Sequence, residues 1–152
     1  MAAGNGISAS DSTAYLSYAI SISTLIVAVL GPVLGTVADG KNRKKPLFAL
    51  FMMTGVLGCA ALALPKSAIL FLAVFVITKV GFSGSLIFYD SMLVDVTTDE
   101  RMDDVSSQGY AWGYIGSCVP FIASLALIFG ADHIGISGTA ATAGAFIINA
   151  LW

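Results

Sequence analysis

Charge is scarce in this sequence. Of its 152 residues, 11% are charged and 57% are apolar, whereas about a quarter of the residues of a soluble domain are charged. With so few charges, a soluble globule of this size would expose apolar patches far larger than soluble monomers tolerate. The composition therefore excludes a soluble enzyme and predicts a membrane protein.

Cysteine and histidine are rare as well. Cys59 and Cys118 lie far apart, each inside an apolar run, and His133 is the single histidine. This pattern argues against a disulfide framework and against a metal site. The sequence contains no Walker motif, which excludes ATP-driven pumping within this chain. We expect no catalytic residue, no metal or cofactor, and no nucleic-acid partner.

Apolar stretches predict an all-α, polytopic bundle of transmembrane helices. Residues 1–14 are a polar lead-in without the features of a signal peptide. At about 20 residues per span, five spans follow, at residues 15–38, 46–65, 69–92, 105–131 and 140–152. The last span rises only about 20 Å, against a hydrocarbon core of about 30 Å. We therefore expect a piece of a longer protein, cut inside a helix.

Lysine and arginine set the expected orientation in the membrane. Four basic residues crowd residues 41–45, in the connection between the first two spans. The positive-inside rule therefore predicts that residues 39–45 face the cytoplasm. Residues 90–104 then lie on the cytoplasmic side too, and the amino terminus lies outside.

Small residues four positions apart recur in the spans, a spacing that lets helices approach closely. The pairs include Gly31 and Gly35, Gly55 and Cys59, and Gly109 and Gly113. Pro32 and Pro120 lie inside two of the spans. They indicate either simple kinks between packed helices or broken helices at a transport site.

The first connection, residues 35–45, reads GTVADGKNRKK. An acid at a helix end, a turn and then a cluster of cations predict a tight hairpin locked by charge. The pattern resembles the signature between the second and third helices of the major facilitator superfamily, from which Gly40 and Asn42 depart. The resemblance implies that Asp39 and Arg43 latch the cytoplasmic side and release it as the two halves of the transporter move.

Two further stretches narrow the resemblance. Residues 81–101 (GFSGSLIFYDSMLVDVTTDER) and 105–116 (VSSQGYAWGYIG), with residues 21–26, resemble the vacuole-effluxer, autophagy-related permeases, particularly their bacterial members. The resemblance implies a twelve-helix transporter that works by alternating access, with the five spans as helices two to six. It also implies small solutes, of which amino acids leaving the fungal vacuole are the known case. The implied location is a bacterial plasma membrane, or a vacuolar membrane in a eukaryote.

The second connection is acidic and is expected on the same face as the basic hairpin. Opposite charges near a protein surface attract, so we predict that Arg43 pairs with Asp90 or Asp95. The alternative is a solvated acidic loop, because exposed ion pairs are weak. The full predicted latch consists of Gly35, Asp39, Arg43, Lys44, Asp90, Asp95 and Arg101.

Lys79 lies near the middle of the third predicted span. A cation there costs about 2.5–3.5 kcal/mol on insertion scales and should face protein or water. Ser83 and Asp90 follow at spacings that put all three residues on one face of a helix. We predict that Lys79 and Ser83 bind the substrate, with Lys79 on a carboxylate; the alternative is that Lys79 snorkels or makes a structural bond.

Two other classes of protein compete with a transporter. Residues 81–84 and 135–138 match the GxSG of intramembrane rhomboid proteases, but His133, the required base, lies outside the predicted spans. The second competing class is a non-transporting membrane subunit, in which the spans form an interaction module of a larger complex. A cavity beside Lys79 favours the transporter, whereas a partner chain that neutralises Lys79 favours the subunit.

Overall fold

The computed structural model describes residues 9–40, 43–64 and 67–152, and every regular element within these ranges is a helix. The predicted all-α fold class is therefore confirmed. The elements are α1 (Ala9–Ala38), α2 (Lys44–Ala61), α3 (Ala68–Ser91), α4 (Leu93–Val96), the 3-10 turn η2 (Asp99–Arg101), α5 (Met102–Phe129), α6 (Ala131–Ile134) and α7 (Gly138–Leu151).

Four of the helices, α1, α2, α3 and α5, are long and apolar enough to cross a membrane, as judged by length and composition. They match the first four predicted spans, and the shorter apolar helix α7 takes the position of the fifth. α1 begins at Ala9, so residues 9–14 of the predicted lead-in form its first turns. Asp11 in the first turn suits the positive end of the helix dipole. The rest of the lead-in, residues 1–8, lies outside the described residues.

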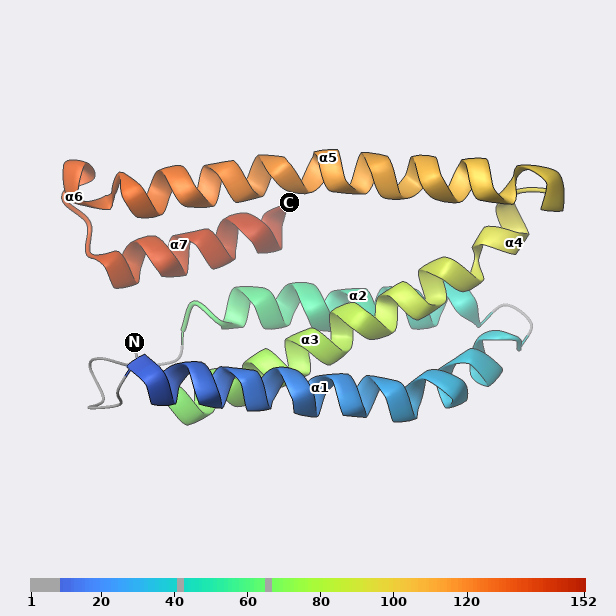
Figure 1. The fold of residues 1–152 in the computed structure, drawn as a ribbon, viewed down its shortest axis with the longest axis horizontal. Coiled ribbons are helices and arrows are strands. Elements are labelled where there is room, and N and C mark those ends of the chain that lie inside the picture. The colour runs from blue at the N-terminus through green and yellow to red at the C-terminus, as the bar shows by residue number, and fades with distance from the viewer. Residues whose placement is uncertain (1–8, 41–42, 65–66) are drawn as a thin grey trace.

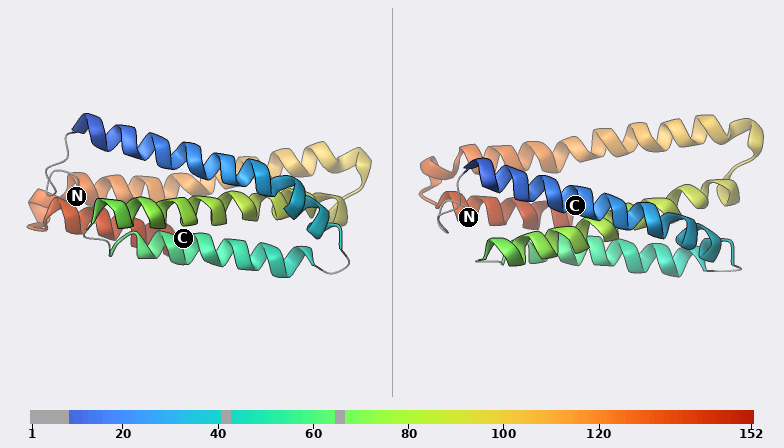
Figure 2. Two further views of the ribbon diagram at one scale, coloured as in Figure 1. Left: turned by 90° about the horizontal axis from the view of Figure 1, so that it is seen from below. Right: turned by 60° about the horizontal axis from the view of Figure 1, so that its bottom comes forward.

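The helices form two packed groups (Figure 1). α3 lies between α1 and α2 and packs against both of them, and α7 packs against α5 and α2. Figure 2 shows α1 and α2 on opposite sides of α3. We call the end where α1 stops, α2 begins and α4 lies the basic end. The end where α1, α3 and α7 begin is the far end.

The closest approach is the crossing of α2 and α3. A methyl group added to Gly81 would lie 2.7 Å from the backbone nitrogen of Gly55 and 3.1 Å from the carbonyl oxygen of Phe51. Both glycines are buried. In the same interface the rings of Phe51 and Phe88 lie with their centroids 5.5 Å apart. The two helices therefore meet backbone to backbone, which only glycine allows at this position.

Small-residue spacing coincides with a helix contact at some positions of the described residues and not at others. The pair Gly55 and Cys59 lies on faces of α2 that meet other helices, since the Cys59 Sγ is 3.6 Å from the carbonyl oxygen of Phe146 in α7. At Gly35 and Gly113 an added methyl group would have no neighbour within 4 Å among the described residues. The close packing expected at these two glycines is therefore absent from the described part of the chain.

The two prolines leave their helices continuous. Pro32 lies inside α1, and Pro120 lies buried inside α5. Transmembrane helices tolerate proline where neighbouring groups satisfy the freed carbonyl. Neither position is a broken helix of the kind that forms transport sites in some families.

A polar link joins α5 to α7. The Asn149 side-chain amide donates a 2.9 Å hydrogen bond to the hydroxyl of Ser124, which is buried, and a second bond of 2.8 Å to the carbonyl oxygen of Ala145. Hydrogen bonds of this kind hold membrane helices together, where each contributes about 0.6–2 kcal/mol.

Candidate functional site

The polar face of α3 points away from α2. Gly81 and Phe88 form the face that meets α2, and Lys79 lies about 200° from Gly81 at 100° per residue. Ser83 and Asp90 lie within about 40° of Lys79 on the same helix. Lys79 and Ser83 are both partly buried. The predicted stripe therefore lies outside the interface between α2 and α3.

Lys79 makes no hydrogen bond or ion pair with residues 9–40, 43–64 and 67–152. Ser83 likewise makes no side-chain hydrogen bond within these ranges. By contrast, the hydroxyls of Thr78 and Ser85 on the same helix donate to the carbonyl oxygens of Val74 and Phe82. A cation and a hydroxyl one turn apart on α3 are thus both without a side-chain partner among the described residues.

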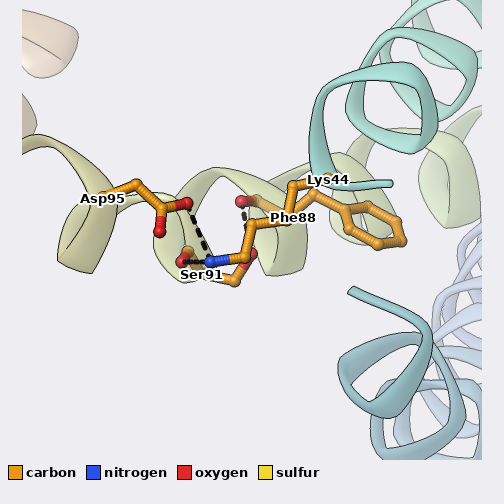
Figure 3. Close-up of polar contacts among 4 residues, drawn as sticks. All are labelled: Lys44, Phe88, Ser91 and Asp95. Atoms are coloured by element: carbon orange, nitrogen blue, oxygen red, sulfur yellow. Dashed lines mark hydrogen bonds and ion pairs between the residues drawn. The ribbon is translucent and has the colours of Figure 1, made fainter. Parts of the chain in front are cut away.

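At the basic end, Lys44 joins α2 to the elbow between α3 and α4 (Figure 3). Its Nζ lies 2.8 Å from the Asp95 Oδ2 and donates a second bond of 2.9 Å to the carbonyl oxygen of Ser91. The Lys44 side chain is 21% exposed and that of Asp95 is 55% exposed. The pair therefore lies at the edge of the bundle, where water weakens it.

The predicted pairing of Arg43 with Asp90 or Asp95 is wrong. Asp95 instead forms its ion pair with Lys44, the neighbour of Arg43. The Arg43 side chain instead lies over Gly40, where an added methyl group would be 3.0 Å from the Arg43 Cδ. Asp90 accepts a 3.0 Å hydrogen bond from the Tyr110 hydroxyl of α5.

Tyr110 is a polar partner that the sequence did not predict, because the bond joins residues twenty positions apart on different helices. Its bond to Asp90 links α3 to α5 at the basic end. Next to it, an added methyl group on Gly109 would lie 3.0 Å from the Tyr89 hydroxyl. The glycine therefore lets α5 approach α3, a contact that the sequence signalled only by the Gly109 and Gly113 spacing.

The other predicted latch residues are not brought together. Asp39, Arg43 and Arg101 are exposed, and their side chains make no hydrogen bond or ion pair within the described ranges. The backbone N–H of Asp39 bonds to the carbonyl oxygen of Gly35 at 3.2 Å, which extends the last turn of α1. Lys41 and Asn42 of the hairpin lie outside the described residues. The conformational role of these residues stays a prediction.

A cavity of about 300 Å³ opens at the far end, between α1, α3 and α7. Its floor is aromatic: Phe71 of α3 and Phe146 of α7 lie with ring centroids 6.0 Å apart. The lining residues are Ser12, Tyr15, Leu16, Ala68, Phe71, Leu72, Gly138, Thr139, Thr142 and Phe146.

The serine–histidine contact that an intramembrane protease requires is absent from the described residues. His133 lies in the short helix α6, and neither Ser83 nor Ser137 hydrogen-bonds to it in the described structure. The Ser137 hydroxyl instead caps α7 by accepting from the backbone N–H of Ala140. Within the described ranges, no group of three or more His, Cys, Asp or Glu side chains could hold a metal ion.

Comparison with known families decides the assignment. Residues 5–99, more than half of the chain, match the family described as vacuole effluxer Atg22 like. The chain belongs to the Atg22-like vacuole effluxer family. The matched region contains α1 to α4, with the Lys79 stripe and the Lys44–Asp95 bridge. The Atg22-like family is one of transporters and not of enzymes, as the sequence predicted.

A curated relative extends the match to nearly the whole chain. The chain is 48% identical over 155 residues to a Bacillus subtilis (strain 168) protein described as uncharacterized MFS-type transporter YxiO. The match covers 99% of this chain but 36% of YxiO, so the chain spans about a third of the length of that relative. No solved structure matches the chain. The structure is thus the helical fold of part of an MFS-type transporter.

Proposed function

We propose that this chain forms part of a secondary transporter that moves small solutes across a membrane by alternating access. The observation that carries the proposal is Lys79, a partly buried cation near the middle of α3 that has no partner within the described ranges. A cation at this depth requires an anion or water. A solute that binds and leaves meets this requirement without neutralising the lysine permanently.

The solute group that fits Lys79 is a carboxylate. The lysine ammonium offers three donors, and the Ser83 hydroxyl, one turn further along the same face, offers another. Hydrogen bonds to a charged group contribute about 1.5–3 kcal/mol each. Amino acids, which the family resemblance implies, carry such a group and are the first solutes to test.

The Lys44–Asp95 bridge is the proposed latch. It ties the start of α2 to α4, and both side chains are partly exposed. Such a pair is worth about 0.2–1 kcal/mol, weak enough to break in each transport cycle. At about 1 kcal/mol, the bridge would change the population ratio of two conformations by about fivefold. We propose that the basic end faces the cytoplasm, in a bacterial plasma membrane, and that the rest of the transporter and the bilayer are the partners of this chain.

The test measures uptake of radiolabelled leucine by proteoliposomes that contain the full-length protein. We expect the single variants Lys44→Asp and Asp95→Lys to slow uptake severalfold, because each puts two like charges together. The double variant reverses the bridge and should restore most of the wild-type rate. Lys45→Asp, at an exposed neighbouring cation, is the control and should have little effect. Failure of the double variant to recover would refute the latch, and absence of uptake of any amino acid would refute that solute class.

A further inference from the structure

α1 and α3 pack side by side and run in the same direction (Figure 1). Towards the basic end, a methyl group added to Gly31 would lie 3.8 Å from the Ile87 Cδ1. At the far end, Leu16 and Leu72 line the same cavity. Ile87 follows Gly31 by 56 positions, and Leu72 follows Leu16 by the same 56 positions. With this register, residues 23 and 24 of α1 lie at the level of Lys79.

Thr24 and Lys79 lie on the same side of the contact between α1 and α3. On the other side, α1, α2 and α3 enclose a cavity whose lining includes Ile26 and Ile77. At 100° per residue, Lys79 lies about 160° from Ile77 around α3. Around α1, Thr24 lies about 160° from Ile26, and Ser23, which is fully buried, lies between them. Thr24 is exposed, so both Thr24 and Lys79 point away from this cavity into one open space.

Thr24 offers that space a hydrogen-bond acceptor. Its hydroxyl proton is engaged, because the Thr24 Oγ1 donates to the carbonyl oxygen of Ile20 at 2.9 Å. The oxygen of such a hydroxyl keeps lone pairs that can accept a further hydrogen bond. Lys79 offers the reverse, since an ammonium group has three donors and no acceptor. The two helices therefore present complementary hydrogen-bonding groups at one level of the bundle.

We propose that Thr24 is a second part of the solute site and accepts a hydrogen bond from the ammonium group of an α-amino acid whose carboxylate binds Lys79. This inference rests on the proposed function and assigns the residue that distinguishes amino acids from other carboxylates. The axes of packed helices lie about 8–10 Å apart. The two charged groups of an α-amino acid are separated by a single carbon–carbon bond, so the zwitterion fits between a long lysine side chain on α3 and a short threonine on α1.

The test uses the purified full-length protein in nanodiscs and measures, by isothermal titration calorimetry, the binding of leucine and of isocaproate, which is leucine without its amino group. We expect the wild type to bind leucine about tenfold more tightly than isocaproate, as one hydrogen bond to a charged group allows. Thr24→Val keeps the shape of the side chain and removes the acceptor. It should weaken the binding of leucine about tenfold and leave that of isocaproate unchanged. Thr24→Ser keeps the oxygen and should retain the preference for leucine.

Thr36→Val is the matched control and should bind both ligands as the wild type does. Thr36 is also exposed on α1, and its hydroxyl donates to the carbonyl oxygen of Val33 at 2.8 Å, but it lies about 18 Å further along the helix. Equal affinity of the wild type for leucine and isocaproate, or the same effect of Thr24→Val on both ligands, would overturn the Thr24 inference while the proposed function stands. If the wild type binds neither ligand, or if Lys79→Gln leaves the binding of both unchanged, the proposed solute site fails, and the Thr24 inference fails with it.

Discussion

Lys79→Gln is expected to reduce carboxylate binding and uptake by the full-length protein at least tenfold without lowering its stability. The variant removes a charge-assisted interaction with the solute, worth about 1.5–3 kcal/mol, and about 1.4 kcal/mol already corresponds to a tenfold change in affinity. The same substitution removes a cation that has no partner among the described residues. Since a cation near mid-membrane costs about 2.5–3.5 kcal/mol on insertion scales, the unfolding midpoint should stay the same or rise.

This combination separates a binding role from a structural one. If Lys79 made a structural bond elsewhere in the whole protein, Lys79→Gln would lower the unfolding midpoint together with uptake. Lys79→Arg keeps the charge and should retain part of the binding. Lys45→Gln, which removes an exposed cation at the basic end, should leave both quantities near their wild-type values. Uptake and unfolding midpoints measured on the same preparations distinguish the binding role of Lys79 from a structural role.

Gly81→Leu is expected to prevent stable folding. A single added carbon at Gly81 would already lie 2.7 Å from the Gly55 nitrogen and 3.1 Å from the Phe51 carbonyl oxygen. These are backbone atoms, so the clash is relieved only if α2 and α3 separate. Overpacking typically costs about 1–3 kcal/mol and occasionally more, and four carbons against backbone belong to the severe cases. We expect most of the variant to elute as aggregate in size-exclusion chromatography.

Gly113→Leu is the matched control for this substitution. Gly113 lies in a long transmembrane helix too, but an added methyl group there has no neighbour within 4 Å among the described residues. Gly81→Ala should give an intermediate result, with a lowered unfolding midpoint in a protein that still folds. Equal behaviour of Gly81→Leu and Gly113→Leu would show that α2 and α3 do not cross as described.

The helices and the polar stripe of α3 could be predicted because they depend on local patterns. Runs of apolar residues predicted four helices that are long and apolar enough to cross a membrane, and a fifth, shorter apolar helix. The spacing of Lys79, Ser83 and Asp90 fixed their common face, since helical periodicity alone decides which residues align. The direction in which this face of α3 points within the bundle could not be predicted, because it depends on Gly81 and Phe88 packing against α2.

The partners of the charged residues could not be predicted from spacing. Arg43 and Lys44 are adjacent, and only the exit angle of the chain from the hairpin decides which one reaches Asp95. Tyr110 reaches Asp90 because Gly109 lets α5 approach α3, a contact that depends on tertiary packing. Glycine spacing marks a smooth helix face without saying what meets it, and at Gly113 no described residue lies against that face.

The central claim is that the Lys79 face of α3 lines a water-filled path that opens alternately to the two sides of the membrane. The most direct test places a cysteine at Ser83 in a full-length protein whose other cysteines have been replaced. A membrane-impermeant thiol reagent is then applied from each side in turn. We predict labelling from both sides, slowed by a bound carboxylate, whereas a cysteine at Leu57, exposed on the outside of α2, stays unlabelled. A cysteine at position 83 that reacts from neither side would contradict the account.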